Sequence, residues 1–131
     1  MKKRNVIGLI LLVIYLCAVA WCCFGHLEHM PKAPKSLMGI HMDKVGHFIM
    51  FLPFPFLFFS SFGFIPKKRW QSFVTAFVTL LAGLLVAAGT EIGQSFTSYR
   101  GADPKDFLSD ALALAFSSVI IIIRIACSRK R

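Results

Sequence analysis

Four long apolar segments constrain the fold of this 131-residue chain more than any other feature. They lie at about residues 5–25, 45–65, 71–91 and 106–127, and each has the roughly 20 residues that a helix needs to cross a hydrocarbon core of roughly 30 Å. Fewer than half of the residues remain for loops and tails, so no soluble domain fits beside them. We therefore predict an all-α polytopic membrane protein, a four-transmembrane-helix bundle that forms a single domain over residues 1–131.

The positions of the basic residues predict how this bundle is oriented. The net charge is +9, and three basic clusters, at residues 2–4, 67–69 and 129–131, border the apolar segments. They fall on alternate connections, and cytoplasmic loops are the ones enriched in Lys and Arg, so both termini are predicted to be cytoplasmic. Charges placed in this way argue against a nucleic-acid partner. The basic start also fits a signal peptide, but Trp21, Cys22 and Cys23 occupy the place of a cleavage site, so we predict a retained helix.

All six acidic residues fall on the outward side of this topology. Acids contribute little to topology, so their segregation needs another cause, and a shared polar site would supply one. Four of the six lie in the stretch from Glu91 to Asp110, between the last two apolar segments. A carboxylate at membrane depth costs about 2.5 kcal/mol or more, so Glu91 is expected to face the bundle interior or to pair.

The residues expected to converge at the outer end come from three helices. They are Asp43, Lys44, His47, Glu91, Gln94, Arg100, Asp106 and Asp110. Asp106 and Asp110 are four residues apart on one helix face, which calls for a cation between them, most simply Arg100, or for one protonated carboxyl. Arg100 and Lys44 could hold a phosphate or carboxylate. The alternative is a buried polar network that only fixes the packing of the bundle.

Local signals predict three structural details. Pro53 and Pro55 should bend the second helix in mid-membrane, and the carbonyls that they free, at Ile49 and Phe51, need other partners. Small residues in the third helix, with Gly89–Gly93 in GxxxG spacing and Gly83–Ala87 in a related one, should allow close helix approach. Asp103 is expected to cap the fourth helix, with Pro104 at its first position.

Signals for catalysis are weak. His47 with Asp43 or Glu91 could act as a general base and its orienting group, but no Ser or Cys nucleophile lies in an activated setting. No HExxH-type signature is present, and the HxxH spacing of His26 and His29 has only Glu28 nearby, so we predict no metal and no cofactor. Whether the protein is an enzyme stays open.

Three stretches, DKVGHFIMF, EIGQSFTSYR and DFLSD, together resemble the signature of the VanZ-like family. The matching residues, in order and spacing, are Asp43, Lys44, His47, Phe51, Glu91, Gln94, Phe96, Arg100 and Asp106. The resemblance covers about residues 42–113. The chain departs from the family pattern at Asp110, where Asn is usual, and at Ala113, where Gly is usual. The first departure makes the site more acidic.

The resemblance implies a multi-pass protein of the bacterial cytoplasmic membrane that acts at the cell envelope, in a family whose namesake is linked to resistance to teicoplanin. We expect an envelope-associated factor with an outward-facing polar site for an anionic lipid head group or a glycopeptide-type amphiphile. Its partners would be membrane lipids and a lipid-linked envelope precursor or an amphiphilic antibiotic, and the oligomeric state is left open. The alternatives are a membrane-embedded hydrolase or transferase of lipid-linked substrates and a small proton-coupled exporter.

Overall fold

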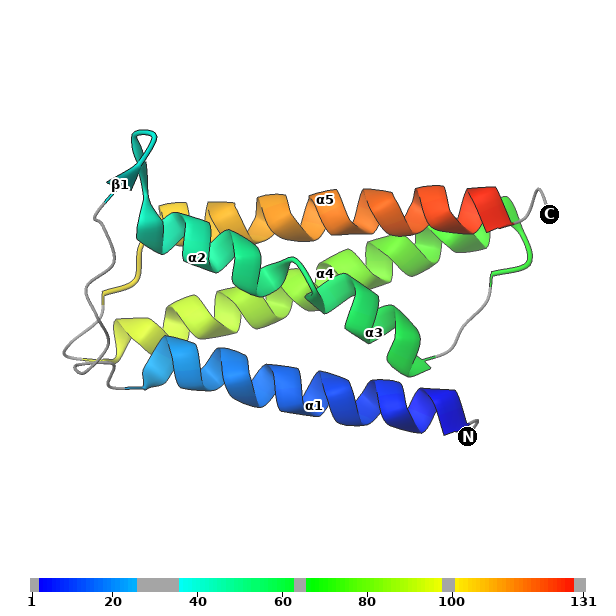
Figure 1. Cartoon of the computed structure of the whole chain (residues 1–131), viewed down its shortest axis with the longest axis horizontal. Coiled ribbons are helices and arrows are strands. Elements are labelled where there is room, and N and C mark those ends of the chain that lie inside the picture. Colours follow the sequence, from blue (N-terminus) through cyan, green and yellow to red (C-terminus); the bar gives the residue numbers. More distant parts are fainter. Residues whose placement is uncertain (1–2, 26–35, 63–65, 98–100, 129–131) are drawn as a thin grey trace.

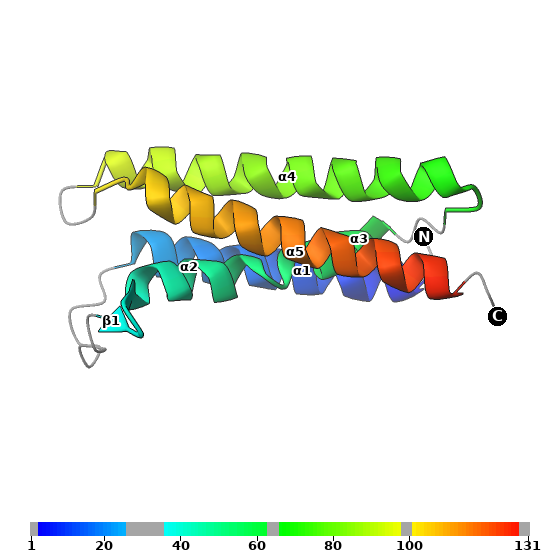
Figure 2. The ribbon, with the colours of Figure 1, turned by 90° about the horizontal axis from the view of Figure 1, so that it is seen from above.

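The computed structural model describes residues 3–25, 36–62, 66–97 and 101–128. It contains five helices and one small hairpin, in the order α1 (Lys3–Phe24), β1 (Ser36–Leu37), β2 (Ile40–His41), α2 (Met42–Phe51), α3 (Phe54–Phe62), α4 (Arg69–Ser95) and α5 (Pro104–Ser128). Within the described residues, four stretches are long and apolar enough to cross a membrane, with α2 and α3 together making the second of them. The predicted all-α, four-helix membrane bundle is therefore confirmed (Figures 1 and 2).

The helices extend further toward the predicted polar site than the hydropathy indicated. The second helix begins at Met42 rather than near residue 45, and α4 continues to Ser95 rather than ending near residue 91. Glu91 and Gln94 therefore lie inside a helix. The β1–β2 hairpin lies directly before α2, and its turn residues Met38 and Gly39 both have positive φ. Hairpin turns of two residues favour this geometry because it matches the twist of the strands.

The sides of the bundle, which run along the helix axes, are apolar. Large hydrophobic side chains on all four spans are exposed, among them Ile14, Phe77, Leu85 and Phe116. Exposed apolar area on this scale is rare in soluble monomers and is what a lipid-facing surface requires. Trp21 near the end of α1 and Trp70 at the start of α4 are also exposed, at opposite ends of the bundle, as expected for anchors at the two membrane interfaces.

Small residues bring the helices together, although only part of the predicted pattern is used. A Cβ on Gly83 would lie 2.5 Å from Leu114 of α5, and Ala87, one turn later, is fully buried. Gly93 packs against the Phe24 ring of α1. A Cβ on Gly89, by contrast, would meet no side chain or neighbouring helix within 4 Å, and Gly89 is exposed. The Gly83–Ala87 pair thus makes the close approach, and the Gly89–Gly93 motif does not act as a pair.

The prolines break the second span into two helices with different neighbours. α2 ends at Phe51 and α3 begins at Phe54. α2 packs chiefly against α5, whereas α3 packs chiefly against α1. The predicted bend is confirmed, but the backbone carbonyls that accept side-chain hydrogen bonds are those of Met50, from Tyr15 of α1, and Leu52, from Ser117 of α5. Each lies one residue after a carbonyl that the sequence indicated, those of Ile49 and Phe51.

We expect Ser117→Ala to lower the free energy of unfolding by about 1 kcal/mol, because the Leu52 carbonyl would lose the 2.7 Å hydrogen bond from the Ser117 hydroxyl in a region without water. The measurement is reversible unfolding in mixed micelles. Ser109→Ala is the control, since the Ser109 hydroxyl donates to the Lys105 carbonyl of its own helix. Equal stability of the two variants would show that the bond across the helix break contributes nothing.

Candidate functional site

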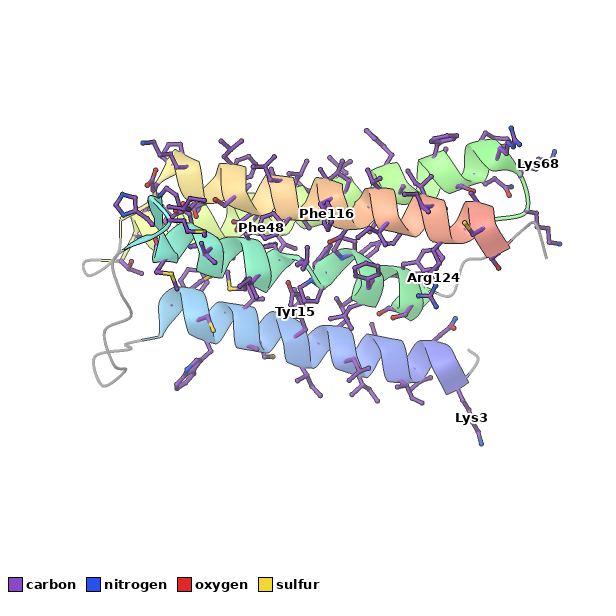
Figure 3. All side chains as sticks on the ribbon, turned by 45° about the horizontal axis from the view of Figure 1, so that its top comes forward. Lys3, Tyr15, Phe48, Lys68, Phe116 and Arg124 are labelled. Atoms are coloured by element: carbon purple, nitrogen blue, oxygen red, sulfur yellow. The ribbon has the colours of Figure 1, made fainter. Side chains whose placement is uncertain are left out.

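The acidic side chains among the described residues gather at the end of the bundle opposite the basic residues that flank the chain termini and the α3–α4 connection. Lys3, Lys68 and Arg124 lie toward the end that carries both termini (Figure 3). At the other end, α2 and α5 begin and α4 finishes (Figure 1). Asp43 and Asp106 are in the first turns of α2 and α5, where the positive end of the helix dipole stabilises a carboxylate.

Lys44 joins the start of α2 to the start of α5. Its Nζ lies 3.1 Å from Asp103 Oδ2 and 3.1 Å from Asp106 Oδ1. Asp103 also accepts the backbone N–H of Lys105 at 2.9 Å, which is the helix-capping contact expected of it. The Lys105 N–H and the Lys44 ammonium together hold the pKa of Asp103 below its usual value. The capping role was predictable, but the ion pair with Lys44 had no signal in the sequence.

His47 lies between the two stacked aspartates of α5. Its Nδ1 is 3.1 Å from Asp110 Oδ1, and its Nε2 is 3.7 Å from Asp106 Oδ2. His47 is 5% exposed and Asp110 is fully buried. Among the described residues, the side chains that can bring positive charge to the stacked acids are therefore Lys44 and, when its ring is protonated, His47. The expected cation was Arg100, which lies outside the described residues.

Lys44, His47, Asp103, Asp106 and Asp110 thus form one cluster of charged and polar side chains. Glu91 reaches this cluster from α4. One carboxylate oxygen, Oε2, accepts the backbone N–H of Asp103 at 3.2 Å and so ties the end of α4 to the start of α5. The other, Oε1, is buried and has no hydrogen-bond partner in the described part of the chain. The same is true of Asp110 Oδ2. Buried carboxylate oxygens without a donor are costly in an apolar bundle, so these two atoms need an explanation.

Two of the eight predicted residues sit at the margin of the cluster. Asp43 is exposed, although its carboxylate comes within 4.8 Å of ligand atoms of His47 and Asp106. Gln94 is 2% exposed, and its side-chain nitrogen donates to the Cys23 carbonyl of α1 at 3.2 Å. A helix end leaves carbonyls without intrahelical donors, and Gln94 satisfies one of them. Its contact therefore joins α4 to α1 and contributes to packing.

The cluster has two chemical properties. Carboxylates outnumber the basic side chains near them: Asp43, Glu91, Asp103, Asp106 and Asp110 lie with Lys44, His47 and Lys105 among the described residues. The hydrogen bond from the His47 ring to Asp110 is also the arrangement in which an acid orients an imidazole for proton transfer.

Two groups of three side chains have metal-ligand spacing. Asp43, His47 and Asp106 form one group. His47, Glu91 and Asp110 form the other, and all three members of this second group are buried. Each group offers one ligand atom per residue, with all the atoms within 4.8 Å of one another.

The comparisons with known proteins agree with the sequence motifs. The family model described as VanZ/LLP1 matches residues 12–125, which includes every residue of the cluster. Neither the search of curated proteins nor the search of solved structures found a match. A match over this share of the chain, on a bundle of four membrane-crossing helices, shows that this multi-pass membrane protein belongs to the VanZ/LLP1 family.

Proposed function

We propose that this protein is an envelope-associated factor that binds the polar head group of an anionic amphiphile at the outer face of the bacterial cytoplasmic membrane. The observation that carries the proposal is the cluster of acidic side chains, with Lys44 and His47, at the bundle end opposite Lys3, Lys68 and Arg124 (Figure 3). Because cytoplasmic segments are enriched in Lys and Arg, the cluster would face outward, at the level of the head groups. The exposed apolar helix faces below it suit the hydrocarbon part of such a ligand.

Binding of an anionic head group requires positive charge that is not already paired with the acids of the cluster. Lys44 is already engaged by two aspartates, so an anionic head group needs positive charge from elsewhere. Arg100, in the connection between α4 and α5, is one source, since a guanidinium can bind a phosphate or carboxylate through two parallel hydrogen bonds.

Arg100→Gln is expected to weaken binding of a polyprenyl phosphate at least tenfold, because a charge-assisted hydrogen bond contributes about 1.5–3 kcal/mol. Binding is measured on the protein in phosphatidylcholine nanodiscs, with teicoplanin as a second probe. This second arm tests the glycopeptide class and with it a contribution to resistance.

Arg69→Gln is the matched control, because Arg69 begins the same α4 helix at the opposite end of the bundle. Equal binding of both probes by the two variants would refute a head-group site at the α4–α5 connection.

The His47–Asp110 hydrogen bond favours a second candidate function, a hydrolase or transferase acting on a lipid-linked substrate. In that case His47 would be the general base, and Asp110 would orient it. Incubation of the reconstituted protein with a labelled polyprenyl diphosphate separates the two functions. Product formation supports the enzyme, and binding without product supports the binding factor.

A further inference from the structure

We propose that His47, Glu91 and Asp110 bind a divalent transition-metal ion of the Mn²⁺ or Zn²⁺ class. The sequence alone predicted no metal here, because the three residues come from α2, α4 and α5 and share no local motif. In the structure their ligand atoms lie within 4.8 Å of one another. The inference concerns the same cluster as the proposed head-group site, but it stands on its own geometry.

The two oxygens without donors point to a cation. Glu91 is 8% exposed and Asp110 is fully buried, and each has one buried oxygen with no hydrogen-bond partner among the described residues. A carboxylate oxygen accepts but does not donate, so only a donor, a proton or a metal ion can satisfy it. A divalent ion bound by both carboxyl groups would balance their two negative charges.

The distances fit a shared ion. Zinc bonds to imidazole nitrogen and carboxylate oxygen are about 2.0–2.2 Å long, so neighbouring ligands of a tetrahedral ion lie about 3.4 Å apart. The 3.1 Å between His47 Nδ1 and Asp110 Oδ1 is close to that value, and an ion bound by these two atoms would replace the proton of their hydrogen bond. One imidazole and two carboxylates leave at least one coordination position open. Such a mixed donor set suits Mn²⁺ or Zn²⁺, whereas an imidazole ligand is unfavourable for Mg²⁺ or Ca²⁺.

The second three-residue group is less suitable. Asp43 is exposed, and Asp106 Oδ1 already pairs with the Lys44 ammonium at 3.1 Å. An ion bound beside Asp106 would experience the repulsion of that ammonium at close range. Among the described residues, no lysine pairs with Glu91 or Asp110.

The ion would also supply the positive charge that binding of an anionic head group requires. Its open position could accept a phosphate or carboxylate oxygen, so a cluster rich in acids would bind an anion through the metal. This role rests on the proposed function. The metal site itself does not.

The test measures metal binding by purified protein in nanodiscs, using electron paramagnetic resonance for Mn²⁺ and competition for Zn²⁺. We expect one bound ion per chain. Glu91→Gln and Asp110→Asn should each weaken Mn²⁺ binding at least tenfold, since even loss of a group that only supports a ligand costs about 10–100-fold. Both substitutions keep the size of the side chain, and Asn retains a hydrogen bond to His47.

Arg69→Gln is the control, because Arg69 begins α4 at the opposite end of the bundle and its replacement leaves the cluster unchanged. Its Mn²⁺ affinity should stay within about twofold of the original, well under the smallest loss expected for a missing ligand. Absence of metal binding, unchanged binding in Glu91→Gln and Asp110→Asn, or loss in Asp43→Asn alone would each overturn the proposal.

A chelator separates this inference from the proposed function. Metal binding without any binding of polyprenyl phosphate would leave the metal site standing and refute the head-group function. Polyprenyl phosphate binding that persists in EDTA, with no metal bound by the protein, would support the head-group function and refute the metal site. Binding of the lipid that is lost in EDTA and restored by Mn²⁺ would support both.

Discussion

Replacing His47 by alanine is expected to lower the free energy of unfolding by about 3–5 kcal/mol, the largest loss that we predict for any single residue. The ring lies 3.1 Å from Asp110 and 3.7 Å from Asp106, both buried on α5. Without it, two stacked carboxylates remain in an apolar bundle with Lys44 at only one of them. When the His47 ring is protonated it forms a buried ion pair with these acids, and removing one partner of such a pair leaves an uncompensated charge, which is the source of the cost.

Unfolding of the reconstituted variant in mixed micelles would measure this loss. The double variant His47→Ala/Asp110→Ala provides the matched comparison, because removing both partners together is often close to neutral. We therefore expect it to be more stable than His47→Ala alone. A His47→Ala variant as stable as the original protein would mean that these aspartates carry no charge that His47 must balance.

Gly8→Leu is expected to lower the free energy of unfolding by about 3 kcal/mol, at the upper end of the cost of overpacking a core. A Cβ at residue 8 would lie 2.9 Å from the backbone carbonyl group of Ser60 and 2.9 Å from the Ser61 nitrogen. Backbone atoms cannot move aside as the tip of a side chain can. α1 and α3 would have to separate along the surface where they pack most closely.

Gly89→Leu is the control for this prediction, because Gly89 also lies in a helix but has open space around it. Leucine is a better helix former than glycine, so this variant should be as stable as the original protein or more so, by up to about 1 kcal/mol. Similar losses in both variants would indicate a general effect of leucine and would refute close packing of α1 on α3.

Much of the fold was predictable because its determinants are local. Four apolar runs of sufficient length specify four crossings, since a helix in lipid must satisfy its backbone hydrogen bonds within itself. Pro53 and Pro55 lack the N–H group that would continue a helix, so the break there was also predictable. Asp103 and Pro104 are a capping pair, and α5 begins at Pro104 as they indicate.

The sequence predicted which residues are candidates for the charged cluster, but not which of them contact one another. Acids placed near helix ends have to face the interior or pair, which singled out Glu91, Asp106 and Asp110. Which cation each acid meets depends on how the helices are rotated about their axes. That rotation placed His47 beside Asp110, and it directed Gln94 to the end of α1.

The sequence by itself determined the number of crossings, the place of the helix break and the end of the bundle at which the acids gather, because these follow from apolar length, proline chemistry and spacing along one chain. Only the tertiary structure decided which small residues are used for packing and which acids share His47. Gly83 lies against Leu114 while Gly89 faces outward, and the break at Pro53 turns α2 toward α5. Contacts between helices are set by packing across the bundle, and no local pattern specifies them.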